Sequence, residues 1–283
     1  MPELPEVETV CRGLAKTIKG HRIKRTTVRR RDLRRPVPDH FAARTEGRMI
    51  RDIGRRSKYI LIHLDDEGVV IWHLGMSGRV RFYKGNMAGF NPEKHDHIIF
   101  ESIKEENHDE PPILTIFNDT RRFGLMVLTT ENRLADHPLL NHLGPEPLSQ
   151  SFDTDYFYRR IKKSKAPIKN LILDQGIVPG MGNIYASESL YQAGIDPRQP
   201  GTEIVRESAE KLVEAIKDIL QRAVEAGGSS IKDHIQTDGT LARFQHQFKV
   251  YGRKEEPCQN CDTPIEKIVQ GGRATFFCPN CQK

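Results

Sequence analysis

The stretch KYILIHLDDEGVVIWHL (58–74) holds two apolar runs on either side of a break made of Asp, Glu and Gly. β-branched and aromatic residues dominate both runs, as they do in strands, and a polar break with Gly is typical of a turn. Further short runs of the same kind follow up to residue 129: RVRFY, HIIFESI, ILTIFND and LMVLT. This succession predicts a mostly antiparallel β domain, arranged as a sandwich.

A helical pattern precedes these strands. Apolar side chains recur at helical spacing and Gly20 closes the run; they are Val7, Val10, Cys11, Leu14 and Ile18. We expect this first helix to pack on the sandwich. Cys11 is then interpreted as a small core residue and not as a reactive thiol.

The periodicity changes to helical again after HLGPEPLSQSFD (142–153), whose Gly and Pro residues are typical of a linker. Two short helices are expected around 166–174 and 183–194, joined by QGIVPGMG (175–182). A long helix is expected within 202–228, with one apolar stripe: Leu212, Val213, Ile216, Leu220, Ala223 and Val224. The fold class is therefore α+β: a β domain, a helical domain and a Cys-bearing C-terminal part.

The charge of the chain is modestly basic. Its 283 residues include 44 Lys and Arg against 38 Asp and Glu, a formal net charge of +6. The basic residues concentrate in HRIKRTTVRRRDLRR (21–35), and ESIKEENHDEPP (101–112) is an acidic counterpart that we interpret as an exposed loop. The basic run is either a solvated face or a surface for a polyanion. No apolar run is long enough for a membrane span and no secretory signal is visible, so a cytosolic location is expected.

Four of the five cysteines form two CxxC pairs, Cys258/Cys261 and Cys278/Cys281, with sixteen residues between the pairs. Each pair can hold one edge of a tetrahedral zinc ion, and the separation suits a β-hairpin. We expect one structural zinc, because four thiolates leave no open position for a catalytic water. A redox dithiol is the alternative. Arg273 lies in the expected hairpin, where a guanidinium could reach a phosphate.

Three turns could contact a nucleic acid. The glycines of QGIVPGMGN (175–183) would let backbone N–H groups approach a phosphate, with Asn183 as a further donor, although a plain helix–turn–helix joint explains them too. NDTRRFG (118–124) places two arginines beside Phe123, and HLGMSGR (73–79) places Met76 at a turn. Together the last two indicate an apolar and cationic probe for a duplex. No turn matches a Walker A loop or a dinucleotide fingerprint, so no nucleotide cofactor is expected.

The N-terminus begins Met-Pro-Glu. Removal of Met1 would leave Pro2 with a secondary amine, which is partly unprotonated near neutral pH because α-amino groups titrate at about 7.7–8.0. Such an amine can attack an electrophilic carbon and form an iminium intermediate, with Glu3 moving the proton. Pro5 and Glu6 are explained as a helix start, but that interpretation leaves Pro2 and Glu3 unexplained.

The opening MPELPEVETV resembles the bacterial formamidopyrimidine-DNA glycosylases, which excise 8-oxoguanine and ring-opened purines. The similarity continues in order along the whole chain, in RRSKYILIHL, HLGMSG, KHDHI, DTRRFG, HLGPEPL, KAPIKNLILDQ, GNIYASE, GGSSIKD, VYGRKEEPC and RATFFCPNCQK. The resemblance implies a base-excision-repair enzyme with both glycosylase and abasic-site lyase activity, which cleaves the strand by β,δ-elimination.

The family's motifs carry over to named positions of this sequence. Pro2 would be the Schiff-base nucleophile and Glu3 the proton donor, while Lys58 and Arg273 would serve the two eliminations. The resemblance implies that four residues grip the DNA backbone: His95, Arg121, Lys165 and Asn183. Met76, Arg121 and Phe123 would fill the space left by the extruded base.

The resemblance also implies the domain plan. We expect a catalytic β-sandwich at 1–135, a linker at 136–153, a helix–two-turn–helix domain at 154–245 and a zinc finger at 246–283. GGSSIKDHIQTDGTLARFQ (227–245) would cap the flipped base. The expected partner is damaged double-stranded DNA. We expect the protein to be a monomer and not to bind a membrane.

Two alternatives remain open from the residues. An enzyme of the endonuclease VIII type would prefer oxidised pyrimidines, but that group usually has PEGPE where this chain has PELPE with Leu4. A non-catalytic zinc-ribbon protein would explain the basic run and the cysteines. That hypothesis would give no reason for the presence of Pro2, Glu3 and Lys58.

Overall fold

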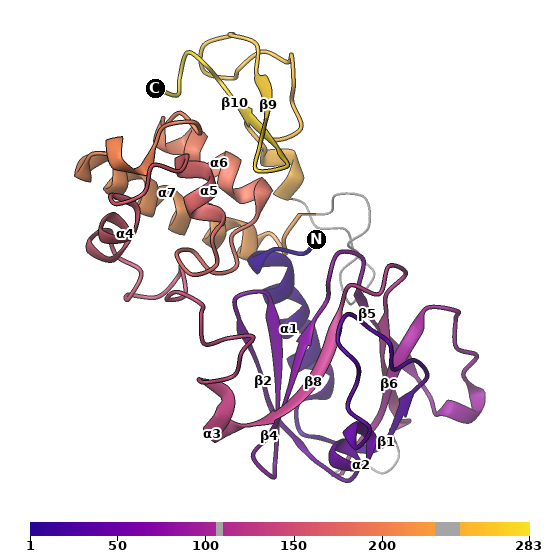
Figure 1. Cartoon of the computed structure of the whole chain (residues 1–283). Coiled ribbons are helices and arrows are strands. Elements are labelled where there is room, and N and C mark those ends of the chain that lie inside the picture. The colour runs from indigo at the N-terminus through magenta and orange to yellow at the C-terminus, as the bar shows by residue number, and fades with distance from the viewer. Residues whose placement is uncertain (106–109, 230–243) are drawn as a thin grey trace. The chain divides into compact units, whose positions relative to one another are not determined.

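The computed structural model describes residues 1–105, 110–229 and 244–283. The chain forms two compact units (Figure 1). The first contains Met1–Pro2 and Glu6–Asn141, and the second contains Glu3–Pro5, His142–Ser229 and the C-terminal residues from 244 on. The chain thus passes from the first unit to the second between Pro2 and Glu3.

The first unit is built on two antiparallel sheets of four strands each. One sheet has the order β1-β6-β7-β5, with β1 (His21–Val28), β6 (Asp96–Lys104), β7 (Ile113–Asn118) and β5 (Arg79–Lys84). The other has the order β2-β3-β4-β8, with β2 (Ile50–Arg56), β3 (Tyr59–Leu64), β4 (Gly68–His73) and β8 (Leu125–Thr130). The expected sandwich of antiparallel strands is confirmed.

The segment 58–74 forms the hairpin β3–β4. Its register pairs Tyr59 with His73 and Ile60 with Trp72. Every residue of β4 is buried, which explains why this strand shows an unbroken apolar run and no alternation. Trp72 packs against Phe117 of β7 in the other sheet, with ring centroids 5.2 Å apart, so the two sheets share one core.

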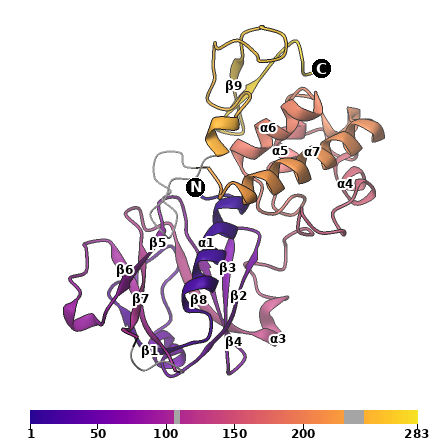
Figure 2. The same cartoon turned by 180° about the vertical axis from the view of Figure 1, so that it is seen from behind.

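Helix α1 (Leu4–Ile18) packs on this core, as the sequence predicts. Its buried side chains Val7, Val10, Leu14 and Ile18 belong to the same cluster as Trp72, and Figure 2 shows α1 running alongside the strands. Cys11 is 4% exposed, and burial raises the pKa of its thiol. The prediction of a core cysteine is confirmed. The short helices of this unit are η1 (Met87–Gly89), α2 (Phe41–Thr45) and α3 (Glu131–Leu134).

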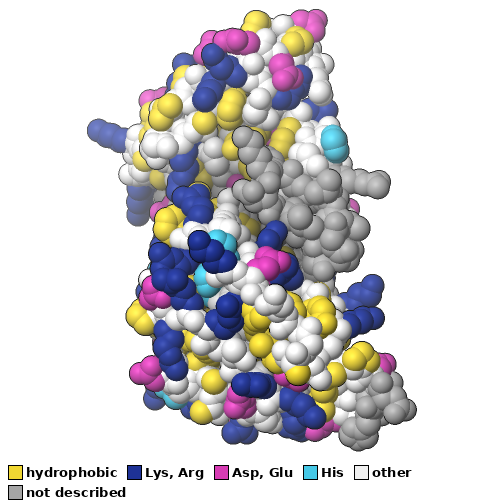
Figure 3. Space-filling model, turned by 90° about the vertical axis from the view of Figure 1, so that its right-hand side faces the viewer, with side chains coloured by type: hydrophobic (Ala, Val, Ile, Leu, Met, Phe, Trp, Pro, Cys, Tyr) yellow, Lys and Arg dark blue, Asp and Glu magenta, His cyan; other side chains and the backbone are white. Residues whose placement is uncertain are grey.

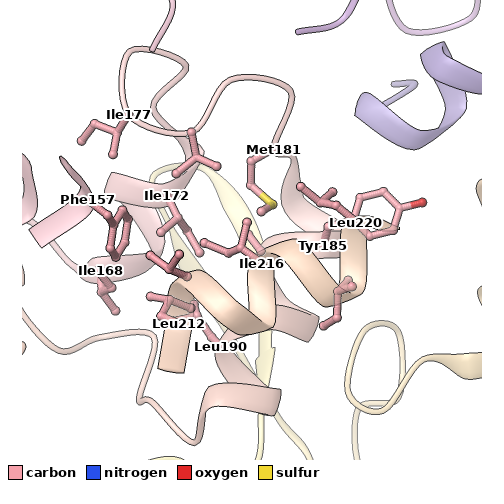
Figure 4. Packing of buried hydrophobic residues seen from close by; sticks show 14 of the residues in the cluster. Phe157, Ile168, Ile172, Ile177, Met181, Tyr185, Leu190, Leu212, Ile216 and Leu220 are labelled. Carbon is pink, nitrogen blue, oxygen red and sulfur yellow. The ribbon is translucent and has the colours of Figure 1, made fainter. Parts of the chain in front are cut away.

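The second unit is mainly helical. Its helices are α4 (Thr154–Ile161), α5 (Ile168–Leu173), α6 (Asn183–Ala193), η2 (Gly201–Glu203), α7 (Arg206–Glu225) and η3 (Phe244–Gln247). Figure 4 shows apolar side chains from α4, α5, α6 and α7 converging on one core, together with Ile177 and Met181 from the α5–α6 turn. The predicted stripe of α7 is buried throughout. The helix begins only at Arg206, because the segment before it forms η2.

The ends of the helices follow ordinary capping rules. Asp153 caps α4 by accepting a hydrogen bond from the Tyr156 N–H at 2.7 Å. Gly194 ends α6 in the left-handed conformation, with φ of 70°. Gly194 closes the range expected for α6, whereas α4 is not among the separate helices expected from the sequence.

The C-terminal residues form an antiparallel hairpin of β9 (Glu266–Gln270) and β10 (Arg273–Phe277). Gly271 and Gly272 make its turn with φ of 54° and 74°, values that favour glycine. A small cluster with Val250, Ile265 and Phe276 packs beneath the cysteines. The α+β fold class, with sandwich, helical part and finger hairpin, is confirmed.

Candidate functional site

The carboxylate of Glu3 lies at the N-terminal end of α6. Its Oε1 accepts a hydrogen bond from the Ile184 N–H at 3.1 Å, and the residue is only 4% exposed. Gly182 makes this approach possible, because a Cβ at that position would lie 2.1 Å from the Glu3 Cδ. A helix start favours a negative charge. At this helix start, directly after the turn expected to face a phosphate, the Ile184 N–H therefore binds a carboxylate of the same unit.

The glycine-rich turn that carries this helix start also holds the next residue of the chain. The Leu4 N–H donates to the Gly180 carbonyl at 3.0 Å, and a Cβ on Gly180 would lie 2.7 Å from that of Leu4. Gln175 shapes the turn from within, since its amide accepts from the Gly180 N–H and donates to the Met181 carbonyl. The turn thus holds the main chain directly after Pro2.

Asn183 and a buried lysine meet at the carbonyl group of Ala274, the residue that follows Arg273. The Ala274 oxygen accepts from the Asn183 Nδ2 at 2.8 Å and from the Lys169 Nζ at 2.9 Å. Lys169 also donates to the Thr275 Oγ1 at 2.6 Å and is fully buried. Arg273 is exposed at the start of β10. The side chains of Lys169 and Asn183 therefore join the finger hairpin to α5 and α6.

Sequence reasoning missed Lys169. Burial, and then the positive charge of Arg273, lower its pKa to about 8, while the Glu3 carboxylate acts in the opposite direction. Lysine is rarely buried without polar partners. The only local signal was its place in the short, mostly apolar helix α5, and its partners come from residues about a hundred positions later in the sequence.

Lys58 lies in the turn between β2 and β3, after Ser57, which has a φ of 55°. It is 6% exposed. Close to it lies His73, whose ring packs on Tyr59 with centroids 5.0 Å apart. Burial, followed by the charges of Lys58 and Arg34, lowers the pKa of His73 to about 4. The predicted elimination lysine is thus buried beside a neutral imidazole.

The two loops expected to probe a duplex are exposed at their tips. Met76 lies between β4 and β5 with 43% of its surface exposed, and Phe123 lies between β7 and β8 with 44% exposed. The Arg121 guanidinium stacks over the Phe123 ring at 4.8 Å. Large apolar side chains so exposed, next to a cation, suit contact with bases and phosphates.

The other two residues proposed to contact the DNA backbone belong to different units. His95 is half-buried just before β6, and its carbonyl accepts from the Asp119 N–H at 3.0 Å, which joins it to the loop of Arg121. Lys165 is exposed between α4 and α5 in the second unit.

The basic run 21–35 divides into two classes in the structure. Most of its arginines have partners within the unit: Arg22 pairs with Glu105, Arg30 with Asp32, Arg31 with Asp39, and Arg29 donates to two carbonyls. Arg34 and Arg35 make no ion pair with any residue that the structure describes. The Arg34 N–H donates to the Gly124 carbonyl, so this segment adjoins the Phe123 loop. Figure 3 shows Lys and Arg side chains gathered beside His side chains on one face.

The four cysteines converge as predicted. Their Sγ atoms lie within 4.8 Å of one another, with close pairs at 3.4–3.8 Å. Zinc–sulfur bonds of about 2.3 Å in a tetrahedron place sulfur atoms roughly 3.8 Å apart, so the residues fit one zinc ion. The Tyr191 hydroxyl of α6 lies 3.2 Å from the Cys258 Sγ, a contact outside the CxxC pattern that the sequence does not indicate.

The candidate residues divide between the two units. The second unit contains Glu3, Asn183, Lys169 and Arg273, and in it Asn183 and Lys169 share the carbonyl of Ala274. The first unit contains Pro2 and Lys58 and both loops. Most of the proposed capping loop (230–243) lies outside the described residues, as do 106–109 of the acidic stretch. The part of that stretch before them includes Glu105, which pairs with the basic run.

Comparison with known proteins places this geometry in a family. Residues 1–126 match the model of the formamidopyrimidine-DNA glycosylase N-terminal domain and residues 143–235 match that of its H2TH domain. Residues 255–283 match the zinc finger found in FPG and IleRS. The formamidopyrimidine-DNA glycosylases of Rhodospirillum rubrum and Azorhizobium caulinodans are 47% and 46% identical to the chain, over 100% of both partners.

Solved structures of Fpg proteins are similar to this chain as well. The MutM (Fpg) protein of Thermus thermophilus has a TM-score of 0.85 at 37% identity, covering 99% of this chain and 98% of its own. Lactococcus lactis Fpg in complex with DNA containing an abasic site has a TM-score of 0.89 at 34% identity, with 99% of each chain covered. The same protein has been solved with DNA containing Fapy-dG, with a TM-score of 0.88 at 34% identity, covering 99% of this chain and 100% of that one. Among the described residues, no helix is long and apolar enough to span a membrane.

Proposed function

The chain belongs to the formamidopyrimidine-DNA glycosylase family, and from this membership we propose that it removes oxidised purines from duplex DNA through its N-terminal proline. The lesions are 8-oxoguanine and formamidopyrimidines. The observation that carries the proposal is the position of Glu3, buried and fixed on α6 directly after Pro2. Relatives solved with Fapy-dG and with carbocyclic 8-oxo-G support the choice of lesions.

The first step forms the covalent intermediate. The Pro2 nitrogen attacks C1′ of the damaged nucleotide, the bond from C1′ to the base breaks, and the base leaves with its electron pair and takes a proton from water. Glu3 accepts the proton that the Pro2 nitrogen loses and passes it to the ring oxygen of the sugar, whose bond to C1′ then breaks, so that the adduct becomes an iminium ion. The hydrogen bond from Ile184 to Oε1 fixes the carboxyl group for this transfer.

Two eliminations then cut the strand. Loss of a proton from C2′ expels the 3′ phosphate, and a second elimination expels the 5′ phosphate, after which water hydrolyses the iminium and frees Pro2. Lys58 would serve the first elimination and Arg273 the second. The burial of Lys58 beside neutral His73, and the exposed position of Arg273 at the start of β10, support these roles.

The remaining residues bind and open the duplex. Met76, Arg121 and Phe123 occupy the space of the extruded base, and His95, Arg121, Lys165 and Asn183 bind phosphates around the lesion. The exposure of Met76 and Phe123 supports their proposed role in filling the space of the extruded base. Zinc, held by Cys258, Cys261, Cys278 and Cys281, stabilises the finger fold and supplies no reactive group.

The proposal extends to the organisation of the chain. The catalytic sandwich comprises 1–135 and the linker 136–153. The helix–two-turn–helix domain with its capping loop comprises 154–245, and the finger comprises 246–283. The protein acts as a monomer, without a nucleotide cofactor, in the bacterial cytosol and on the nucleoid.

Borohydride trapping tests the chemistry. With a duplex containing 8-oxoguanine, the reduced adduct should map to Pro2, and an uncleaved N-terminal tag should abolish it. A duplex with thymine glycol, run in parallel, is the control for the endonuclease VIII type. No adduct on 8-oxoguanine, or an adduct that persists behind the tag, would overturn the proposal.

A further inference from the structure

The two probe loops of the first unit touch each other backbone to backbone. A Cβ on Gly75 would lie 2.4 Å from the Gly124 nitrogen, and one on Gly124 would lie 2.8 Å from the His73 carbonyl oxygen. Gly75 also has a φ of 69°. The absence of side chains at these positions lets the Met76 loop and the Phe123 loop pack together.

One buried carboxylate bonds to both loops. The Asp119 Oδ1 accepts from the Ser77 hydroxyl at 2.5 Å, in the Met76 loop. Its Oδ2 accepts from the Gly124 N–H at 2.8 Å, in the Phe123 loop. The Arg121 N–H is shared between the Ser77 Oγ at 3.1 Å and the Asp119 Oδ1 at 3.2 Å.

The main chain of Asp119 is itself anchored. Its N–H donates to the His95 carbonyl, and its own carbonyl lies 2.7 Å from the Nε2 of buried His97. Asp119 is fully buried, and no Lys or Arg in the described parts of the chain forms an ion pair with it. A buried carboxylate without a cation is costly unless hydrogen-bond donors surround it. Here the donors are the groups that shape the two loops.

An aspartate is required for this arrangement because both oxygens accept. An asparagine would present an NH₂ group to either Ser77 or Gly124, and one loop would lose its acceptor. Among the described residues, the Asp119 carboxylate forms no hydrogen bond with the side chains of Met76 or Phe123. Its effect on them must therefore come from the two loops that it binds.

We propose that Asp119 is a positioning residue, which holds Met76, Arg121 and Phe123 as one rigid probe and thereby speeds extrusion of the damaged base. This inference rests on the proposed function of the three tip residues. Without the carboxylate the two loops would move independently, and entry into the duplex would slow. Chemistry at a site that has already lost its base would depend less on the probe, since no base remains to be unstacked.

The test compares Asp119→Asn and Ser77→Ala with wild type and with Asp32→Asn as matched control. Asp32 is an exposed carboxylate that pairs with Arg122 of the same loop. Three quantities are measured: single-turnover excision of 8-oxoguanine, cleavage of a preformed abasic site, and the fluorescence rise of 2-aminopurine placed opposite the lesion. Thermal unfolding checks that each variant is folded.

Asp119→Asn should slow excision and the fluorescence rise by about tenfold or more, because small misplacements of positioning groups have effects of this order. Cleavage of the abasic site should change little, and Asp32→Asn should resemble wild type. Adding Met76→Ala to Asp119→Asn should cost less than the sum of the two single changes.

Equal slowing of excision and abasic cleavage, or an unchanged fluorescence rise, would overturn the inference. If Asp119→Asn does not fold, Ser77→Ala decides in its place, since it removes a single hydroxyl. A wild-type protein that forms no Pro2 adduct would refute the proposed function instead, while the fluorescence of the bound duplex would still report whether Asp119 controls opening.

Discussion

At the scale of single residues, Gly182 shows how a missing side chain fixes a functional group. The Glu3 carboxylate reaches the Ile184 N–H only because no Cβ stands in its way. The proposed proton donor therefore depends on a residue 179 positions away in the sequence, whose role no local pattern indicates.

We predict that Gly182→Ala reduces formation of the Pro2 adduct, by about a hundredfold if the displacement of Glu3 approaches 1 Å. A Cβ placed 2.1 Å from the Glu3 Cδ must push the carboxyl group away. Borohydride trapping under single-turnover conditions measures the effect. Gly89→Ala is the control, since its Cβ would meet nothing closer than 3.8 Å. Wild-type trapping by Gly182→Ala would contradict the proposed role of Glu3.

His73 gives a second prediction at this scale, about pH. Burial and the charges of Lys58 and Arg34 hold its pKa near 4 in the folded protein, below its ordinary value of 6.5. The unfolded chain therefore binds a proton as pH falls below 6.5, whereas the folded protein binds it only near pH 4. The Nδ1 accepts from the Gly75 N–H at 2.9 Å, and protonation would remove that bond.

The free energy of unfolding should thus fall between pH 6.5 and 4, with a contribution from His73 of at most about 3 kcal/mol. His73→Gln should show a shallower fall across the same interval. Urea unfolding at several pH values measures this, with His40→Gln as control because His40 is exposed. Parallel pH profiles for wild type and His73→Gln would refute it.

At the scale of elements, the basic segment 29–35 combines two kinds of arginine. Arg30 and Arg31 pair with carboxylates of their own unit, which reduces the charge they offer to DNA. Arg34 and Arg35 have no such pair among the described residues and lie beside the Phe123 loop. The structure thus favours a polyanion surface for one end of the run and a solvated face for the other.

We predict that Arg34→Ala and Arg35→Ala each weaken binding to undamaged duplex and reduce its salt dependence. Loss of one phosphate contact should lower the slope of log Kd against log salt by about one. Arg31→Ala is the control, since Arg31 already pairs with Asp39. Fluorescence anisotropy at several salt concentrations gives the slopes. Equal slopes for all three variants and wild type would contradict the division.

At the scale of the whole molecule, the chain forms two compact units, and each candidate group takes its residues from distant parts of the sequence. The zinc finger is joined to the helical core by Lys169, Asn183 and Tyr191. Arg273 is paired with Gln270 in the hairpin, and the next residue, Ala274, is bonded to Asn183 and Lys169 of the helices. The finger and the helices should lose order together when the metal is removed.

A chelator should release one zinc ion per chain, weaken DNA binding and suppress the second elimination. Tyr191→Phe should release zinc faster, because a hydroxyl that donates to the Cys258 thiolate stabilises its charge. A colorimetric zinc indicator follows the release, and Tyr158→Phe on α4 is the control. Equal release rates would exclude a role for Tyr191, and DNA binding that survives complete loss of zinc would exclude the structural role of the metal.

The strands, the α7 stripe, the zinc cysteines and the exposed tips could be predicted because each depends on local features: β-branched runs between polar breaks, helical period, paired CxxC and glycines at turns. Which polar groups meet became visible only in the folded protein. Glu3 with Ile184, Lys169 with Ala274 and Asp119 with Ser77 are contacts across 181, 105 and 42 positions. Such hydrogen-bond partners are brought together by the packing of sheets and helices, and no local sequence pattern predicts them. The same holds for the basic run, where the fold pairs Arg22, Arg30 and Arg31 with carboxylates and leaves others, Arg34 and Arg35 among them, without one in the described parts of the chain.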